Sequence, residues 1–209
     1  MRGKKLLAAF AAIYIIPYAI LLVFTFAIFI FIGSQSEDEA QKVDMSSSQL
    51  YAMKPGITRK EVIDIALTLV NKVKYFWGGH SMPGWNPLWG TPMLVTAEGD
   101  WSSGTYQPYG LDCSGFIEWV FVSAGTNILH GTTASEWPAT YEIKESELKP
   151  GDLVFEAPGD SSINHIGIFY KRENGVKYYI HCQGGTGVTI NSTSVFKYWR
   201  RPKFEFDGD

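Results

Sequence analysis

LDCSGFIEWVF, at residues 111–121, predicts a helix that begins with a cysteine and is buried along most of its length. Asp112 is a good N-cap residue, because its carboxylate can accept a hydrogen bond from a backbone N–H of the first turn. Apolar side chains dominate the positions that follow, and Gly125 supplies a stop signal. Cys113, one of only two cysteines in the chain, therefore lies at a helix N-terminus, where the local field favours a thiolate.

A cysteine in this position is activated when a histidine from elsewhere in the fold takes its proton. The chain has four histidines, of which His80 and His130 lie in loop-like sequence and receive no role beyond contacts in a groove. His165 and His181 fall in two short runs, HIGIFYK and VKYYIHC, that predict neighbouring strands joined by a hairpin. The register of that hairpin determines whether the two imidazoles share a face of the sheet.

Two registers of this hairpin are plausible. A two-residue turn at 174–175 would oppose His181 to Ile168 and direct His165 to the other face of the sheet. A three-residue loop with a bulge at its glycine would oppose His181 to Gly167 and bring both histidines to one face, close enough to meet. A Cys-His-His site therefore predicts an odd-length loop or a bulge in this hairpin. His165 would then take the thiol proton, and His181 would orient His165.

Each of these side chains also has a purely structural explanation. A cysteine is often a small buried hydrophobe, and a lone histidine is more often structural than catalytic. Cys182 alternates with His181 along its strand, so we expect it to face away from the site. The same alternation argues against a zinc site made of Cys113, His165, His181 and Cys182.

Residues 6–32 form an apolar segment without a charged side chain. The segment is longer than the ~20 residues that a helix needs to cross a bilayer. Basic residues precede it and three acidic residues follow at 37–39, so the positive-inside rule predicts one transmembrane helix with a cytoplasmic N-terminus. A cleaved signal peptide is the alternative, but its apolar core is usually about 7 to 15 residues, which favours an uncleaved anchor in the cell membrane.

The chain is expected to divide into three parts. Residues 1–33 are the cytoplasmic N-terminus and membrane helix, 34–56 an extracytoplasmic linker, and 57–209 one catalytic domain outside the membrane. All 21 acidic residues follow the apolar segment, whereas three of the 18 basic residues precede it, so the exported part is acidic. That charge argues against nucleic acid as a partner. Two cysteines cannot form a disulfide framework, so the domain depends on its own core.

The exported part predicts an α+β domain. Thr58 and Glu61 form a capping box at the start of a helix of about 15 residues. Residues 80–110 are rich in glycine, proline and tryptophan and lack a sustained period, so we expect a loop that packs on the domain or lines a groove. Four later runs predict an antiparallel sheet: GDLVFEA, HIGIFYK, VKYYIHC and GVTIN.

The exported part also resembles a known family, the NlpC/P60 cysteine peptidases of bacterial cell-wall remodelling. The resemblance extends from about residue 58 to 199. It rests on five motifs in this order: YFWGG at 75–79, LDCSGFIEWVF at 111–121, LKPGDLVFE at 148–156, NHIGIFY at 164–170 and YYIHC at 178–182. DCSGF alone is a moderately specific motif, whereas the full series is a strong signal.

The resemblance implies a papain-like fold and hydrolysis of peptidoglycan stem peptides, typically between γ-D-glutamate and the diamino acid. It implies an acyl-enzyme mechanism that needs no cofactor and no metal. Residue by residue, Cys113 is similar to the nucleophile, His165 to the base and His181 to the third polar residue. Tyr75 would join the Cys113 N–H in an oxyanion pocket. The flanking residues of the motif, Asp112 and Ser114, would shape the substrate side.

The chain departs from the family pattern in the long interval between residues 79 and 111, which puts substrate specificity in doubt, and at Glu156, where an aromatic residue is common. A related amidase or acyltransferase would use the same Cys-His chemistry, and a degenerate wall-binding module would need none. The expected partners are peptidoglycan stem peptides and, through the N-terminal helix, the membrane. Secretion or conjugation machinery is a further candidate partner.

Overall fold

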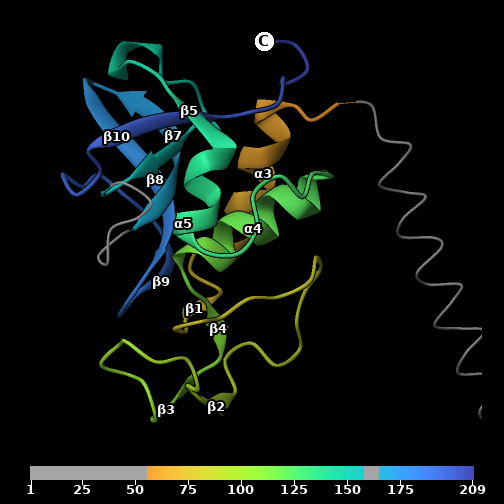
Figure 1. Cartoon of the computed structure of the whole chain (residues 1–209), viewed down its shortest axis with the longest axis vertical. Helices are drawn as coiled ribbons and strands as arrows, with labels where there is room; N and C mark the ends of the chain where they lie inside the picture. The colour runs from red at the N-terminus through yellow and green to blue at the C-terminus, as the bar shows by residue number, and fades with distance from the viewer. Residues whose placement is uncertain (1–55, 158–164) are drawn as a thin grey trace, which may run out of the picture. The chain divides into compact units, whose positions relative to one another are not determined.

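The computed structural model describes residues 56–157 and 165–209, which belong to one compact unit (Figure 1). The segment expected to cross the membrane, 6–32, lies outside the described residues, as does all of the predicted linker except its last residue. Within the described residues, no helix has the length and apolar character that a membrane span requires.

The first described helix, α3, spans Arg59–Leu69 and begins as its sequence predicts. The side chain of Thr58 accepts a hydrogen bond of 3.1 Å from the backbone N–H of Glu61, which is an N-cap interaction. The helix has 11 residues rather than the expected 15 or so, because Val70 leaves the helical backbone and Asn71 adopts a left-handed conformation with φ of 62°. Its apolar face packs against the second helix.

The second helix, α4, spans Cys113–Ala124 and confirms the prediction made from its motif. The Asp112 carboxylate accepts a hydrogen bond of 2.7 Å from the N–H of Gly115, and Gly125 ends the helix with φ of 105°. Only glycine adopts that conformation without a steric cost, which explains the stop at this residue. The helix is buried almost all round because it lies between α3 and the sheet.

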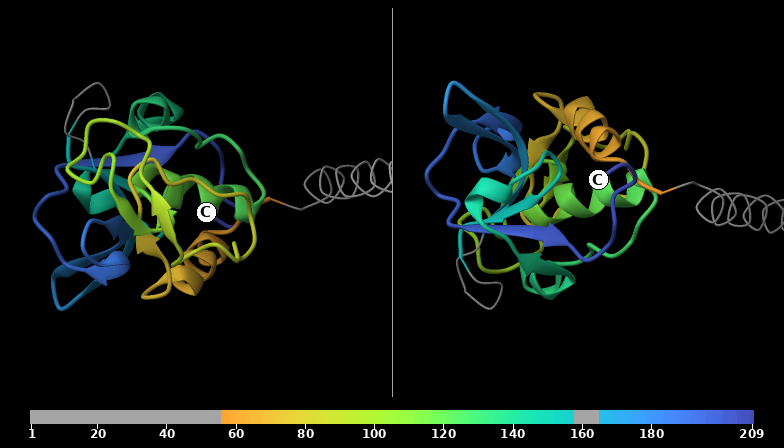
Figure 2. Two further views of the ribbon diagram at one scale, coloured as in Figure 1. Left: turned by 90° about the horizontal axis from the view of Figure 1, so that it is seen from below. Right: turned by 90° about the horizontal axis from the view of Figure 1, so that it is seen from above.

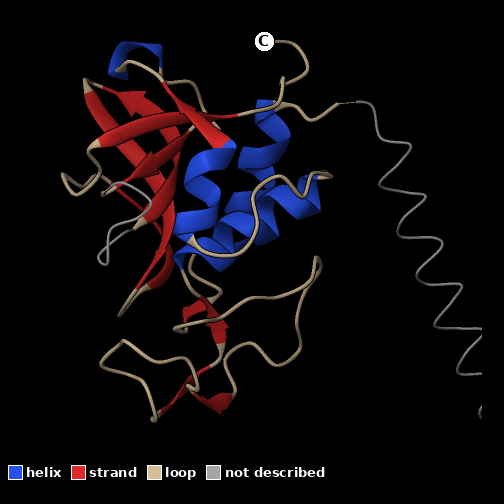
Figure 3. Cartoon of the chain, viewed as in Figure 1, coloured by secondary structure: helices blue, strands red, loops and turns tan. Residues whose placement is uncertain are grey.

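An antiparallel sheet, drawn in red beside the blue helices in Figure 3, forms the other layer. It has six strands in the order β5-β10-β6-β7-β8-β9. The strands are β5 (Thr140–Glu142), β6 (Leu153–Phe155), β7 (Ile166–Glu173), β8 (Val176–Gln183), β9 (Gly187–Asn191) and β10 (Tyr198–Pro202). The four predicted runs correspond to β6, β7, β8 and β9, whereas β5 and β10 were not expected. The α+β expectation is thereby confirmed.

Both helices lie on one side of this sheet, as the views from below and above show (Figure 2). The helix-facing side carries Ile166, Ile168, Ile180 and Cys182 in the main core. Because side chains alternate along a strand, the residues between them point to the other side, where a smaller cluster forms around Phe169, Tyr179 and Phe196. The sheet therefore separates Cys182 from His181, as the alternation predicts.

The hairpin between β7 and β8 combines features of both predicted registers. Its turn has two residues, Asn174 and Gly175, each with positive φ, and Glu173 pairs with Val176. A bulge between Phe169 and Lys171 then shifts the pairing by one residue, so that Ile168 pairs with Ile180. The predicted bulge is confirmed, but its expected position at the turn glycine is wrong. The loop itself is a tight two-residue turn, and the extra residue lies within β7 as a bulge.

The long interval after residue 79 is partly structured. It contains a short antiparallel pair, β2 (Pro92–Leu94) and β3 (Tyr106–Pro108), and leads through β4 (Gly110–Leu111) into α4. The strand β4 pairs in parallel with β1 (Lys74–Tyr75). Short helical turns follow α4 further along the chain, at α5 (Thr133–Glu136), η2 (Trp137–Ala139) and η3 (Glu145–Glu147).

Candidate active site

Cys113 is the first residue of α4 and is almost completely buried, with 7% of its surface exposed. The backbone N–H groups of Ile166 and Ser114 donate hydrogen bonds to its sulfur. Ile166 is the first residue of β7, directly after His165. The thiol therefore contacts the sheet at the point where the strand of the first histidine begins.

The surroundings of Cys113 raise the pKa of its thiol to about 12. Burial is the largest cause, and the negative charges of Asp112 and Glu136 add to it. The two backbone N–H bonds act in the opposite direction but are outweighed. In the free protein the thiol pKa is therefore raised rather than lowered, because burial and the two carboxylates outweigh the two backbone N–H groups.

His165 and His181 share a face of the sheet and contact each other. Nε2 of His165 lies 2.7 Å from Nδ1 of His181, as the Cys-His-His hypothesis requires. On the other side of His181, its Nε2 lies 2.9 Å from Oδ1 of Asn191, in β9. These three side chains form a row that runs from the residue before β7, across β8, to β9.

The row fixes the tautomer of both imidazoles. The amide oxygen of Asn191 can only accept, so Nε2 of His181 carries a proton and donates it. Nδ1 of the same neutral ring is then an acceptor, and it receives the proton of His165 Nε2. His165 is left with an unprotonated Nδ1, which is the form that a general base needs.

Neighbouring apolar groups hold the two rings in place. Phe196 stacks on His165, with ring centroids 5.5 Å apart and planes 13° apart, and meets His181 edge-on at the same centroid distance. Gly167 lies beside them, where an added Cβ would come within 3.0 Å of both His181 Cβ and Phe196 Cζ. A side chain at this position would therefore require His181 or Phe196 to shift by a few tenths of an ångström.

The same packing keeps the imidazoles uncharged. Burial lowers the pKa of His165 to about 3, and the neighbouring His181 contributes to that shift. Burial also lowers the pKa of His181, although its hydrogen bond with Asn191 opposes the change. In the free protein near pH 7, the Cys113 thiol and the imidazoles of His165 and His181 are therefore all uncharged.

The three remaining predicted residues surround the start of α4. Tyr75 reaches it because β1 pairs with β4, placing Tyr75 opposite Leu111. Burial raises the pKa of the Tyr75 phenol, and the charge of Cys113 is the next cause. Asp112 and Ser114 are buried and hydrogen-bonded to each other at 2.9 Å. Their capping role is thus visible in the fold, while a role toward substrate stays a prediction.

His80, for which no role beyond contacts in a groove was expected, lies close to the N-cap residue of α4. Its Nδ1 lies 2.7 Å from a carboxylate oxygen of Glu118, and its Nε2 lies 3.7 Å from Asp112. Glu136 is fully buried nearby, and its two oxygens lack a hydrogen-bond partner within the described part of the chain. Burial raises the pKa of this carboxyl well above its usual range, and the charges of Asp112 and Glu118 add to the shift.

Sequence reasoning missed Asn191, although a signal for it existed. The loop between β8 and β9 is three residues long, and Gln183 pairs with Gly187. Counting along both strands from this loop places Asn191 diagonally across from His181. The position of Glu136, by contrast, depends on a short helix that no periodic pattern predicts.

The second cysteine has a hydrogen-bond partner of its own among the described residues. Cys182 faces away from His181, and its S–H donates to the carbonyl oxygen of Leu111 at 3.0 Å. It consequently lies on the side of the sheet that carries Cys113, whose charge contributes to raising the pKa of Cys182 after burial. Across residues 56–157 and 165–209, no group of three potential ligands could hold a metal ion.

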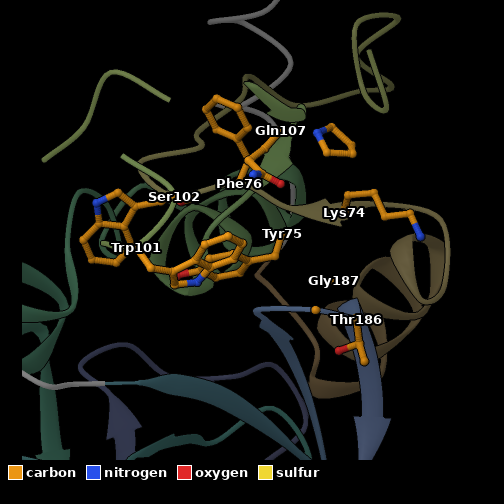
Figure 4. Close-up of a pocket in the computed structure, with 11 residues that line it drawn as sticks. Lys74, Tyr75, Phe76, Trp101, Ser102, Gln107, Thr186 and Gly187 are labelled. Atoms are coloured by element: carbon orange, nitrogen blue, oxygen red, sulfur yellow. The ribbon is translucent and has the colours of Figure 1, made fainter. Parts of the chain in front are cut away.

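A cavity of about 270 Å³ opens beside Tyr75 (Figure 4). Its walls come from β1, from the segment between residues 101 and 108, and from the turn before β9. Tyr75 is the lining residue that links the cavity to the surroundings of Cys113, and the wall from 101 to 108 is supplied by the long interval after residue 79. The expectation that this interval lines a groove is therefore confirmed for this part of it.

Parts of the chain are similar in sequence to characterised or named bacterial proteins. The chain is 41% identical over 92 residues to the "Probable endopeptidase p60" of Listeria monocytogenes, which covers 40% of this chain and 19% of that protein. It is 30% identical over 124 residues to the "Gamma-DL-glutamyl hydrolase" of Bacillus subtilis, 57% of this chain and 28% of that one. The chain thus spans less than a third of either relative.

The fold is that of solved NlpC/P60 domains. RipD from Mycobacterium tuberculosis, described as a non-catalytic NlpC/p60 domain protein adapted to peptidoglycan binding, superposes with a TM-score of 0.51 at 18% identity. The match covers 70% of this chain and 97% of that one. The model of the NlpC/P60 family matches residues 72–206, well over half of the sequence, and on that match the chain belongs to the NlpC/P60 family.

Proposed function

We propose that this chain is a peptidoglycan endopeptidase, in which Cys113 is the nucleophile, His165 the general base and His181 the residue that orients it. The observation that carries the proposal is the row from His165 through His181 to Asn191, with spacings of 2.7 and 2.9 Å. A purely structural histidine pair would not require a fixed tautomer with a free Nδ1, whereas a base that receives a thiol proton does.

The proposed reaction begins with attack by the Cys113 sulfur on the carbonyl carbon of a stem-peptide bond. The thiol proton passes to Nδ1 of His165, and the backbone N–H of Cys113 and the phenol of Tyr75 stabilise the oxyanion. His165 then gives its proton to the leaving amine, and the C–N bond breaks to leave a thioester. A water molecule, deprotonated by His165, hydrolyses the thioester and restores the thiol.

The burial of both partners shapes this mechanism. With a thiol pKa of about 12 and a His165 pKa of about 3, a stable thiolate–imidazolium pair is unfavourable in the free protein. Proton transfer is therefore coupled to attack on bound substrate, when the developing charge passes from sulfur to an oxyanion with its own donors. His181 and Asn191 assist by holding His165 in one orientation throughout.

The bond we propose is that between γ-D-glutamate and the diamino acid of the stem. The name of the Bacillus subtilis relative, a gamma-DL-glutamyl hydrolase, supports this choice. We further propose that residues 6–32 anchor the protein in the cell membrane, with the N-terminus cytoplasmic and residues 57–209 outside, because the segment is uncharged and its flanks differ in charge. Action beside a secretion or conjugation apparatus is compatible with such a tether.

The experiment that tests the activity uses the full chain in detergent with purified muropeptides. Cleavage products should appear with the wild type and vanish with Cys113→Ala, while circular dichroism shows an unchanged fold. Cys182→Ala, which removes the other thiol, is the matched control and should retain cleavage if it folds. Persistent cleavage by Cys113→Ala would refute the nucleophile.

The anchor is tested separately in cells. Protease added to spheroplasts should degrade residues 57–209 of the membrane-bound chain, and carbonate washing should leave the protein in the membrane fraction. Release of a shortened soluble protein would instead indicate a cleaved signal peptide.

Two alternatives predict different products. An amidase would free the sugar lactate from the peptide, whereas an endopeptidase cuts within the peptide, so product masses separate them. The similarity of fold to RipD makes binding without turnover a second candidate. In that case the chain would bind peptidoglycan, yield no product, and be insensitive to a thiol alkylator.

A further inference from the structure

The cavity beside Tyr75 contains groups that the proposed peptide chemistry does not use. Its lining includes four aromatic side chains, Tyr75, Phe76, Trp77 and Trp101, together with the polar side chains of Ser102, Gln107 and Thr186. Figure 4 shows Trp101 on one side and Thr186 on the other, with Tyr75 between them. Tyr75 thus belongs both to this cavity and to the surroundings of Cys113, whose charge affects its pKa after burial.

Trp101 is unusual because 78% of its large apolar surface is exposed. The loop that carries it is nevertheless held in place by hydrogen bonds. The Asp100 carboxylate accepts from the N–H of Ser102 at 2.8 Å and from its hydroxyl, and Ser103 donates to the carbonyl of Ala97 at 2.8 Å. The indole of Trp77 donates to the carbonyl of Glu98 at 2.9 Å.

An exposed indole on a fixed loop is suited to binding. A large aromatic ring that remains exposed in a folded domain gains no burial energy, so the fold alone does not account for its position. Because the loop is already ordered, a ligand that covers the indole would lose little additional conformational entropy from the protein.

The chemistry of the cavity selects a class of ligand. Among the described residues that line it there is no carboxylate, and Lys74 is the one cation. Hydroxyl and amide side chains beside an aromatic face match a sugar ring, whose C–H face packs on an indole while its hydroxyl and acetamido groups form hydrogen bonds. The stem peptide consists mainly of small and charged residues and offers no ring of this kind, whereas each stem is attached to an amino sugar.

We propose that this cavity binds the amino sugar that carries the stem peptide, with the sugar stacked on Trp101. The inference rests on the proposed function, because it treats the sugar as part of the same substrate. The volume of about 270 Å³ lies just below the range of about 300 to 1,000 Å³ usual for small-molecule pockets, which suits a single ring better than a long glycan.

A second exposed tryptophan supplies the internal comparison. Trp85 is 60% exposed and lies in the same long interval, but it lines a different hollow with Leu69 and Trp119, away from Tyr75. If exposure alone produced binding, the two residues would behave alike. If the cavity beside the candidate site binds the sugar, only Trp101 should matter.

The test compares two substrates of identical peptide sequence, one bearing the disaccharide and one without it, using the full chain in detergent. The wild type should show kcat/KM about tenfold higher for the sugar-bearing substrate, which corresponds to the free energy of one good ring contact. Trp101→Ala should bring the two values together without changing turnover of the free peptide. Trp101→Phe should restore part of the preference, and Trp85→Ala should keep all of it.

Other outcomes have definite meanings. Equal rates for both substrates in the wild type, or an equal loss on both in Trp101→Ala, would overturn the sugar site while leaving the endopeptidase intact. If neither substrate is cleaved, the proposed function fails, and binding of free N-acetylmuramic acid, the amino sugar that carries the stem, tests the cavity by itself. Quenching of tryptophan fluorescence that is lost in Trp101→Ala and kept in Trp85→Ala supports the site, and no quenching refutes it.

Discussion

Nε2 of His165 lies 2.7 Å from Nδ1 of His181, although the two-residue turn that joins their strands would, in a regular ladder, place them on opposite faces of the sheet. The bulge between Phe169 and Lys171 removes that conflict by adding one unpaired residue to β7. The contact between the two histidines at one end of the hairpin thus depends on an irregularity in its middle.

Gly167→Ala should disturb the histidine pair. The added methyl would lie 3.0 Å from His181 Cβ and Phe196 Cζ, and both groups are fixed by packing. We expect a loss of stability of about 1 to 3 kcal/mol and a fall in kcat, because overpacking displaces the rings. Urea unfolding and muropeptide turnover measure the two effects.

Gly184→Ala is the control for that substitution, since nothing lies within 4 Å of a Cβ at this residue and its φ is not positive. Its stability and activity should remain close to the wild type. Unchanged kcat in Gly167→Ala would contradict the proposed role of the histidine pair.

Asn191→Leu should lower kcat about 10- to 100-fold with little change in KM, the usual cost of removing a group that orients a reactive side chain. Without the amide oxygen, His181 loses the hydrogen bond that fixes its tautomer and therefore the tautomer of His165. The substitution does not alter the groups that bind the peptide, so KM should remain close to the wild-type value.

Asn191→Asp distinguishes positioning from a merely structural role. The carboxylate still accepts from His181 but adds negative charge, so it should retain more activity than leucine and move the acid limb of the pH–rate profile upward. If leucine and aspartate lower the rate equally with no shift of the profile, Asn191 only supports the fold.

The raised pKa of Cys113 predicts slow alkylation of the free protein. With a thiol pKa of about 12, the thiolate is scarce at pH 7, and the rate with iodoacetamide should rise about tenfold per pH unit up to pH 9. Peptide mass spectrometry would assign the modified cysteine. A rate that is already constant between pH 6 and 9 would show an ion pair in the free protein instead.

Acid should destabilise the fold through His165. Its folded pKa of about 3 is below its ordinary value of 6.5, so the unfolded chain binds a proton first as the pH falls. This stability contribution is complete above pH 6.5 and decreases toward pH 3, by about 2 kcal/mol between pH 6.5 and 5. His165→Gln removes the titrating group, so its stability should fall less over the same range in urea titrations.

His181 supplies a check on that experiment, since its pKa is also lowered by burial and it remains in the His165→Gln variant. Some acid sensitivity should therefore persist. An identical pH dependence in wild type and His165→Gln would mean that His165 is not buried in its neutral form.

The local sequence was sufficient to predict those features that depend on neighbouring residues. Asp112, the apolar run after it and Gly125 together specify α4, because capping and helix termination are short-range interactions. The alternation of side chains likewise placed Cys182 and His181 on opposite sides of their strand. The family motifs, read in order, pointed to the same cysteine and histidines.

The long interval after residue 79 shows where such reasoning ends. Its tryptophans looked alike in sequence, yet Trp89 is buried in the core whereas Trp101 is exposed beside a cavity. The difference depends on hydrogen bonds between parts of the loop and on the strands it meets. No periodic pattern encodes those contacts.

The sequence by itself determined the α+β class, the helix that begins at Cys113 and the need for an irregular hairpin, since each follows from residues close together in the chain. Only the tertiary structure decided the position of the bulge, the partnership of His181 with Asn191 and the protonation of the thiol. Those features depend on groups far apart in sequence, such as Cys113 and Ile166, and on burial. The free energy of a buried charge is set by all of its surroundings, which the fold assembles from every part of the domain.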